Sequence, residues 1–136
     1  KRAKEIYWPY HHAIEAQIDR LKGQGAAPIF VSIHSFAPVM DGKARPWEMG
    51  VLWDEDAVTA DLFLRELSSA GYIVGDNEPY SGRGARNFTI KHHAERNALR
   101  NASIEVRQDL VDDKEGIELM ANVLQKVISS AAGLDI

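Results

Sequence analysis

Amphipathic helical segments alternate with short apolar segments of strand length along this chain, and this alternation most limits its possible folds. The first helical segment, from about residue 2 to 21, carries apolar side chains at helical spacing, and the apolar segment 28–34 follows it. Two further apolar segments, 50–53 and 72–74, enclose a helix that begins after the acidic residues 54–56. Strands separated by helices predict an α/β fold, in which helices flank a mostly parallel or mixed sheet.

The last third of the chain continues this alternation. Thr89 is placed to cap a short helix that runs to about residue 99, segment 103–107 reads as a fourth strand, and an amphipathic helix is expected from about 113 to 132. The helix after the acidic residues is expected to turn four apolar side chains inward: Val58, Leu62, Phe63 and Leu67. No repeat, linker or low-complexity segment divides the 136 residues, so we expect them to belong to a single domain.

Charge and composition argue against several classes of partner. The net charge is −4 and the Lys and Arg residues are scattered, so no strong basic field attracts nucleic acid. No apolar run approaches the roughly 20 residues that cross a bilayer, so we expect no membrane partner. The absence of cysteine excludes disulfides and thiolate metal ligands, and it is compatible with a reducing, cytoplasmic setting.

His34 ends the first predicted strand, at a position where chemistry is expected. In open α/β sheets, ligands bind at the carboxyl ends of strands. Strand alternation places Phe30, Ser32 and His34 on one face. A neutral imidazole is a good zinc ligand, and a strand end fixes its direction. The alternative is a histidine that only forms hydrogen bonds with nearby backbone.

A second set of polar residues lies on the fourth predicted strand. Ser103, Glu105 and Arg107 alternate with apolar residues and therefore share a face. One interpretation is a buried ion pair between Glu105 and Arg107. The other makes Glu105 a general base, with Arg107 neutralising a substrate carboxylate or an oxyanion.

Two polar loops and two short histidine strings complete the candidates. Loop 75–84 carries more hydrogen-bonding groups than a plain surface turn needs, so it is a candidate binding loop. Loop 41–48 adds the cation of Arg45 and the ring of Trp47, which is either a packing anchor or a binding residue. His-x-x-Glu occurs twice, as His12 with Glu15 and as His92 with Glu95. This spacing can serve a metal, but on a helix it more often marks a solvated face or a hydrogen-bonded pair.

Taken in order along the chain, these segments resemble the N-formylglutamate amidohydrolase family. No single segment is specific, but together they cover nearly the whole sequence. The segments that carry the resemblance are 9–11, 32–36, 45–48, 50–53, 75–82, 89–93 and 104–110.

The resemblance implies a fold related to zinc carboxypeptidases and zinc-dependent deacylases. The activity it implies is hydrolysis of N-formyl-L-glutamate to formate and L-glutamate, a late step of histidine degradation. It assigns His34 as a zinc ligand and Glu105 as the general base. The residues it implies for substrate binding are Arg83, Arg107, Asn77, Glu78, Tyr80, Arg45 and His93.

The resemblance also implies that the remaining zinc ligands come from an N-terminal half that this chain lacks. A catalytic zinc ion takes about three protein ligands. We therefore expect residues 1–136 to be the C-terminal part of one amidohydrolase domain, inactive alone. The alternatives are hydrolysis of another N-acyl amino acid or small amide, and a non-catalytic carboxylate-binding domain of the same fold.

Overall fold

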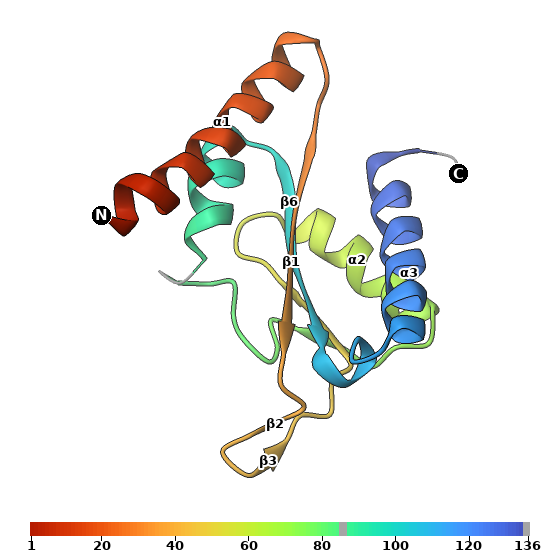
Figure 1. Cartoon of the computed structure of the whole chain (residues 1–136). Helices are drawn as coiled ribbons and strands as arrows, with labels where there is room; N and C mark the ends of the chain where they lie inside the picture. The colour runs from red at the N-terminus through yellow and green to blue at the C-terminus, as the bar shows by residue number, and fades with distance from the viewer. Residues whose placement is uncertain (85–86, 135–136) are drawn as a thin grey trace.

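The computed structural model describes residues 1–84 and 87–134, which form a four-stranded mixed sheet covered by helices (Figure 1). In spatial order the strands are β1 (Ile29–Phe36), β6 (Arg100–Arg107), β4 (Met49–Leu52) and β5 (Val74–Asp76). β1 is parallel to β6, β6 is antiparallel to β4, and β4 is parallel to β5. The prediction of an α/β fold with a mostly parallel or mixed sheet is confirmed.

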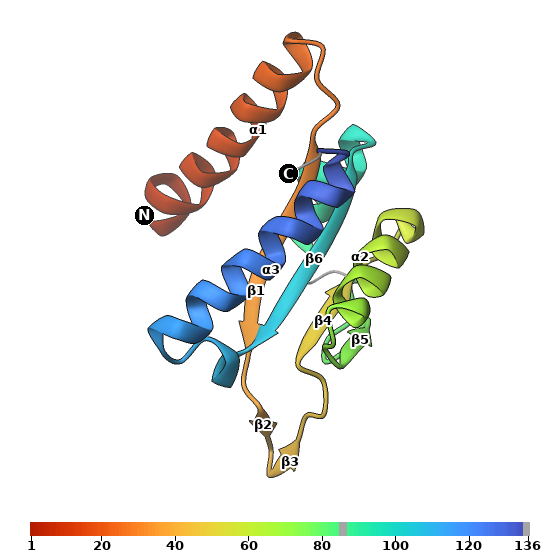
Figure 2. The ribbon, with the colours of Figure 1, turned by 90° about the vertical axis from the view of Figure 1, so that its right-hand side faces the viewer.

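Helices cover both faces of this sheet. Figure 2 shows α3 (Lys114–Ala132) in front of β1 and β6, with α2 (Ala57–Ser69) beside it in front of β4 and β5. On the other side lie α1 (Trp8–Gly23) and the short π-helix η2 (Ile90–Ala94) (Figure 1). The first turns of the chain form a second π-helix, η1 (Ala3–Tyr7), which continues directly into α1. The remaining elements are the β2–β3 hairpin (Val39–Met40 and Lys43–Ala44) and the 3₁₀ turns η3 (Glu95–Asn97) and η4 (Gln108–Leu110).

The main hydrophobic core lies between the sheet and the α2–α3 layer. Phe63 and Leu67 of α2 and Ile104 of β6 are fully buried there. A smaller cluster on the opposite face joins α1 and η2 to the sheet through Ile18, Ile90, Ala94 and Leu99, with Phe30 of β1 packed against it. Successive residues of β1 and β6 therefore point alternately into two different environments. No helix of the described residues is long and apolar enough to cross a membrane.

Aspartates begin the two helices of the main core. Asp56 accepts a hydrogen bond from Thr59 N at the start of α2, and Asp113 accepts one from Gly116 N at the start of α3. The second carboxylate oxygen of Asp56 accepts a hydrogen bond from the backbone N–H of Asn101, at 2.8 Å. Asp56 therefore fixes α2 to the beginning of β6.

Three local predictions differ from the structure. The strand expected at 72–74 occupies Val74–Asp76 instead, because the backbone of Ile73 is bonded to Glu48 just before the ladder begins. Val58 is 79% exposed, since the buried stripe of α2 runs through Thr59 and residues 60, 63 and 67. Thr89 does not cap the next helix, because its own backbone is already helical (φ −61°, ψ −47°).

Candidate active site

The register of β1 and β6 places His34 directly beside Glu105. Paired residues of neighbouring strands lie about 4.8 Å apart and point to the same face of the sheet. Ile104 and Val106 point into the main core, so His34 and Glu105 point to the opposite face. Sequence alternation predicted the face of each residue, and the register brings the two together.

A cavity of about 660 Å³ opens on this face. Four of the predicted site residues line it: His34, Tyr80, Arg83 and Glu105. Its other lining residues are Leu52, Pro79, Ser81, Gly84, Asn87 and Ser103. This volume lies within the range of small-molecule sites, and the side chains supply a base, a cation and hydroxyl groups.

Glu105 is a buried carboxyl group with a perturbed pKa. Glu105 is only 6% exposed, and this burial raises the pKa of its carboxyl group above the ordinary value of 4.5. The charges of His34 and Arg45 act in the opposite direction, but burial outweighs them. A carboxylate whose pKa lies closer to neutrality accepts and returns protons more effectively at physiological pH.

Arg83 and Tyr80 form the wall contributed by loop 75–84. The Arg83 guanidinium lies over the Trp53 ring, 4.6 Å from its centroid, and this contact holds a cation at the cavity. The Tyr80 hydroxyl accepts a hydrogen bond from Arg45 at 3.1 Å. Because the hydroxyl oxygen is the acceptor in that contact, the contact does not use the Tyr80 proton.

Asn77 and Glu78 shape this loop from outside the cavity lining. The Asn77 side-chain oxygen accepts from the backbone N–H groups of Trp53 (3.1 Å) and Gly82 (2.8 Å). The Glu78 side chain is exposed, and its carbonyl oxygen packs against Gly50, where a Cβ atom would overlap it. Both residues therefore hold the loop in place, and neither contacts the cavity.

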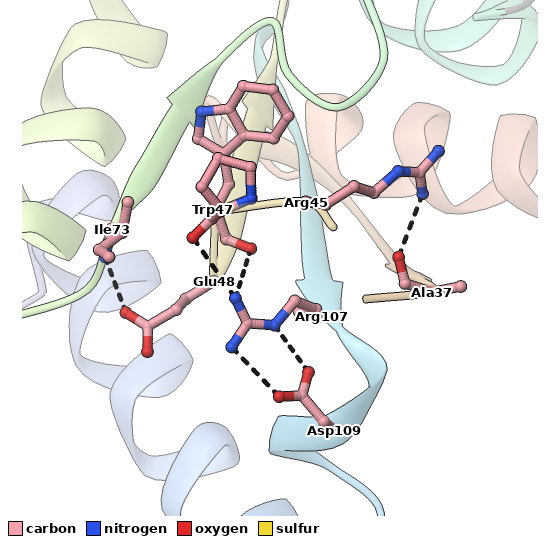
Figure 3. A network of polar contacts seen from close by, with 8 residues as sticks. Ala37, Arg45, Trp47, Glu48, Ile73, Arg107 and Asp109 are labelled. Atoms are coloured by element: carbon pink, nitrogen blue, oxygen red, sulfur yellow. Dashed lines mark hydrogen bonds and ion pairs between the residues drawn. The ribbon is translucent and has the colours of Figure 1, made fainter. Parts of the chain in front are cut away.

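Arg107 is occupied by contacts within the chain (Figure 3). Its guanidinium donates two hydrogen bonds to Asp109, at 2.7 and 3.1 Å, and further ones to the carbonyl oxygens of Trp47 and Pro46. The hydrogen bond from Arg107 lowers the pKa of Asp109. The ion pair considered between Glu105 and Arg107 does not form. Arg107 does not line the cavity, so its position favours a structural role over binding of a substrate carboxylate.

Comparison with known proteins identifies the family. The model of the N-formylglutamate amidohydrolase family matches residues 1–111. The chain belongs to this family.

Two solved structures have the same fold as this amidohydrolase family member. A gene product of Agrobacterium tumefaciens is 31% identical, with a TM-score of 0.90 over 97% of this chain and 52% of that one. An N-formylglutamate amidohydrolase of Ralstonia eutropha is 20% identical, with a TM-score of 0.71 over 98% of this chain and 54% of that one. The chain thus spans about half the length of both structures. A search among curated proteins gave no match.

The zinc ion expected at His34 can be tested against the residues of this family member. His34 fits one ligand position, because its exposed imidazole borders the cavity beside a carboxylate. Its Nε2 lies 2.8 Å from the Ser32 hydroxyl, which must turn away if that nitrogen is to bind an ion. No group of three possible ligands includes His34 within residues 1–84 and 87–134. Catalytic zinc takes three protein ligands, so these residues alone do not complete its coordination.

Two further predicted residues lie away from the cavity lining. Arg45 donates to the Ala37 carbonyl at 3.3 Å (Figure 3) and also to the Tyr80 hydroxyl, so it acts on the site through Tyr80 and through its charge. His93 is fully buried between α1 and the sheet, where its ring contacts those of His11 and Phe30. That position does not support direct contact of His93 with a ligand in the cavity.

Several lining residues were not predicted. Ser103 shares a face with Glu105, so alternation signals its orientation, but a serine alone carried no assignment. Leu52 pairs with Ser103 across the antiparallel ladder, and this pairing depends on the sheet order. Ser81 lies in loop 75–84, which was predicted as a binding loop, whereas Asn87 follows that loop, and no periodic pattern reveals its path.

Proposed function

We propose that this chain supplies the general base, a substrate-binding arginine and one zinc ligand of an enzyme that hydrolyses N-formyl-L-glutamate to formate and L-glutamate. The observation that carries the proposal is the side-by-side placement of His34 and Glu105 at a cavity that also contains Arg83. Membership of the N-formylglutamate amidohydrolase family supports amide hydrolysis as the reaction class.

Glu105 is the proton-transfer group in this proposal. Hydrolysis of the formyl amide requires a water molecule to lose a proton as it attacks the carbonyl carbon, and the departing amine nitrogen to gain one. The Glu105 carboxylate takes the first proton and delivers it to the nitrogen, so it is regenerated at the end of the cycle. Burial keeps its pKa raised, which favours both transfers near neutral pH.

Arg83 and Tyr80 supply binding and charge stabilisation. A guanidinium can donate two parallel hydrogen bonds to a carboxylate, and the substrate has two carboxylates. The Tyr80 proton, left free by the contact with Arg45, can be donated to the carbonyl oxygen as negative charge develops there. When bound at His34 and at ligands beyond the described residues, zinc supplies positive charge that polarises the same carbonyl.

The direct test is formate release from N-formyl-L-glutamate, measured in the presence of zinc. The 136-residue chain is assayed beside the longest polypeptide that its gene encodes, and turnover is expected only where a complete set of zinc ligands is present. In the active form, Glu105→Gln is expected to remove most turnover. Glu118→Gln on α3 is the matched control, because it makes the same chemical change at an exposed position. A near-normal rate in Glu105→Gln refutes the general-base role.

Substrate choice is tested separately. If Arg83 holds the side-chain carboxylate, Arg83→Met raises KM for N-formyl-L-glutamate more than for N-formyl-L-glutamine. Equal effects on both substrates refute that contact. Faster hydrolysis of a different N-acyl amino acid in the same panel assigns the enzyme another substrate while leaving the role of Glu105 intact.

A further inference from the structure

A cluster of histidines and one glutamate joins α1 to η2 on the same side of the sheet as the cavity. Glu15 of α1 and His92 and His93 of η2 each place a possible ligand atom within 4.8 Å of the other two. The Glu15 Oε1 and His92 Nε2 atoms are 3.2 Å apart. Two ligand atoms that bind the same zinc ion at about 2.1 Å in a tetrahedral arrangement lie about 3.4 Å apart, so this pair already has suitable spacing.

His93 is the buried member of the cluster. Its residue is 0% exposed, its Nε2 lies 2.7 Å from Nδ1 of His11, and its own Nδ1 is buried with no partner among the described residues. If Nε2 carries the proton and donates it to His11, Nδ1 is left with a free lone pair. Histidines that bind metals usually donate their other ring N–H to a fixed acceptor in this way.

The backbone around the cluster is also unusual. η2 is a π-helix that carries both histidines, and η1, immediately before α1, is a second one. π-Helical residues make up well under about 1% of globular proteins and frequently occur at functional sites. The Phe88 ring stacks on His92 with centroids 4.9 Å apart, which fixes the orientation of that imidazole.

We propose that Glu15, His92 and His93 bind a divalent transition-metal ion that ties α1 to η2. Two neutral imidazoles and one carboxylate form a ligand set that suits zinc, cobalt or nickel. Neither His-x-x-Glu string binds the ion by itself, because Glu15 comes from the first string and His92 from the second. Glu95 lies instead near the acidic residues Glu55 and Asp54.

This site is separate from the one proposed at His34. His93 stacks against Phe30, whereas His34 lies four residues further along β1, about 13 Å away in an extended strand.

Arg96 is the group that opposes metal binding. Its guanidinium lies 3.1 Å from Nδ1 of His92, where it acts as the donor, so Nε2 of a neutral His92 carries the ring proton. An ion at Nε2 requires the proton on Nδ1 instead, and Arg96 must then turn away. Arg96 is exposed and can do so. Arg96→Ala therefore removes both a competing donor and a repelling charge.

The test uses Co²⁺ as the probe, followed by visible absorption of the 136-residue chain, with Zn²⁺ as the competitor. We expect one ion per chain, with affinity reduced at least about tenfold in His92→Ala and in Glu15→Gln. His12→Ala and His34→Ala are the controls and should retain the wild-type affinity, whereas Arg96→Ala should bind more tightly. His92 and Glu15 are chosen because both are partly exposed, so their replacement leaves the buried His93 in place.

A second readout is thermal stability. Zn²⁺ is expected to raise the Tm of the wild type and of His34→Ala, and to leave the Tm of His92→Ala unchanged. The proposal is overturned if the wild type binds no ion, if His92→Ala and Glu15→Gln bind as tightly as the wild type, or if His34→Ala abolishes binding. None of these outcomes depends on formylglutamate turnover, so the two metal proposals can fail independently.

Discussion

Replacing Asp56 with alanine removes two hydrogen bonds of different kinds from one carboxylate. One oxygen caps α2 through Thr59 N at 3.0 Å, and the other accepts the Asn101 N–H at 2.8 Å. The second bond lies just beyond the point where β4 stops pairing with β6, at Leu52 and Ser103. Asn101 is 2% exposed, so water cannot readily replace the lost acceptor.

The expected cost follows from these two parts. Loss of an N-cap side chain destabilises a protein by about 1 kcal/mol. A buried backbone donor left without a partner costs about 1–3 kcal/mol more. Asp56→Ala should therefore lower the free energy of unfolding by about 2–4 kcal/mol. Asp113 offers a matched control, because its side chain makes the same type of cap to Gly116 N in an exposed setting, and Asp113→Ala should cost only about 1 kcal/mol.

Urea unfolding followed by far-UV circular dichroism measures both variants, with unchanged m-values as the check that only stability has changed. Asp56→Ser keeps a capping oxygen but cannot also reach Asn101, so it should fall between the wild type and Asp56→Ala. Equal losses in Asp56→Ala and Asp113→Ala would refute the reasoning, because the second hydrogen bond would then contribute nothing. Full stability in Asp56→Ser would have the same meaning.

The effect of Asp56 also has a definite pH dependence. Burial acts to raise the pKa of Asp56, but the hydrogen bonds from Thr59 and Asn101 outweigh it and hold the pKa below the ordinary 3.8. The stabilisation is therefore present above about pH 3.8 and is lost as the pH falls through the folded-state pKa. The difference between the wild type and Asp56→Ala should shrink in acid.

Three further predictions concern the site and its supporting contacts. Glu105→Gln should be more stable than the wild type at neutral pH, because burial raises the pKa of Glu105 above 4.5. The wild type is therefore most stable below pH 4.5 and loses stability as the pH rises through the folded-state pKa of Glu105. Thermal melts of both proteins from pH 4 to 8 would detect this difference. Gly50→Ala should cost about 1–3 kcal/mol in urea unfolding, because the added methyl group overlaps the carbonyl oxygen of Glu78. Arg107→Met should lower the free energy of unfolding by about 1–3 kcal/mol, since it releases Asp109 and two carbonyl oxygens, whereas a higher KM at unchanged stability would instead support substrate binding.

Local sequence patterns predicted the elements well because those patterns depend on near neighbours. The apolar composition of 28–34 and the alternation of apolar and polar residues in 103–107 indicated two strands, and the two-residue period of a strand gave the correct faces for His34 and Glu105. The prediction that Val58 is buried was wrong. The sequence of α2 allows more than one face to pack on the core, and in the structure the buried face contains Thr59 and not Val58.

Contacts between distant segments could not be predicted in this way. Arg107 was expected to share a face with Glu105, yet its partner is Asp109, which comes within reach only through the turn after β6. Each His-x-x-Glu string was assessed within its own helix, whereas the structure joins Glu15 to His92 across 77 positions. Spacing within one helix carries no information about which residues of another helix lie opposite it.

The parallel pairing of β1 with β6 also determines when the site can exist during folding. His34 and Glu105 are about 70 residues apart in sequence, so their pairing closes a long loop. The conformational entropy of that loop is lost before the contacts between β1 and β6 stabilise the chain. Helices α2 and α3 and the β4–β5 pair involve much shorter separations along the chain and can form first. The adjacent placement of His34 and Glu105 is therefore expected to be among the last features to assemble and, because β1 pairs only with β6 within the described residues, among the first to be lost when the strand frays.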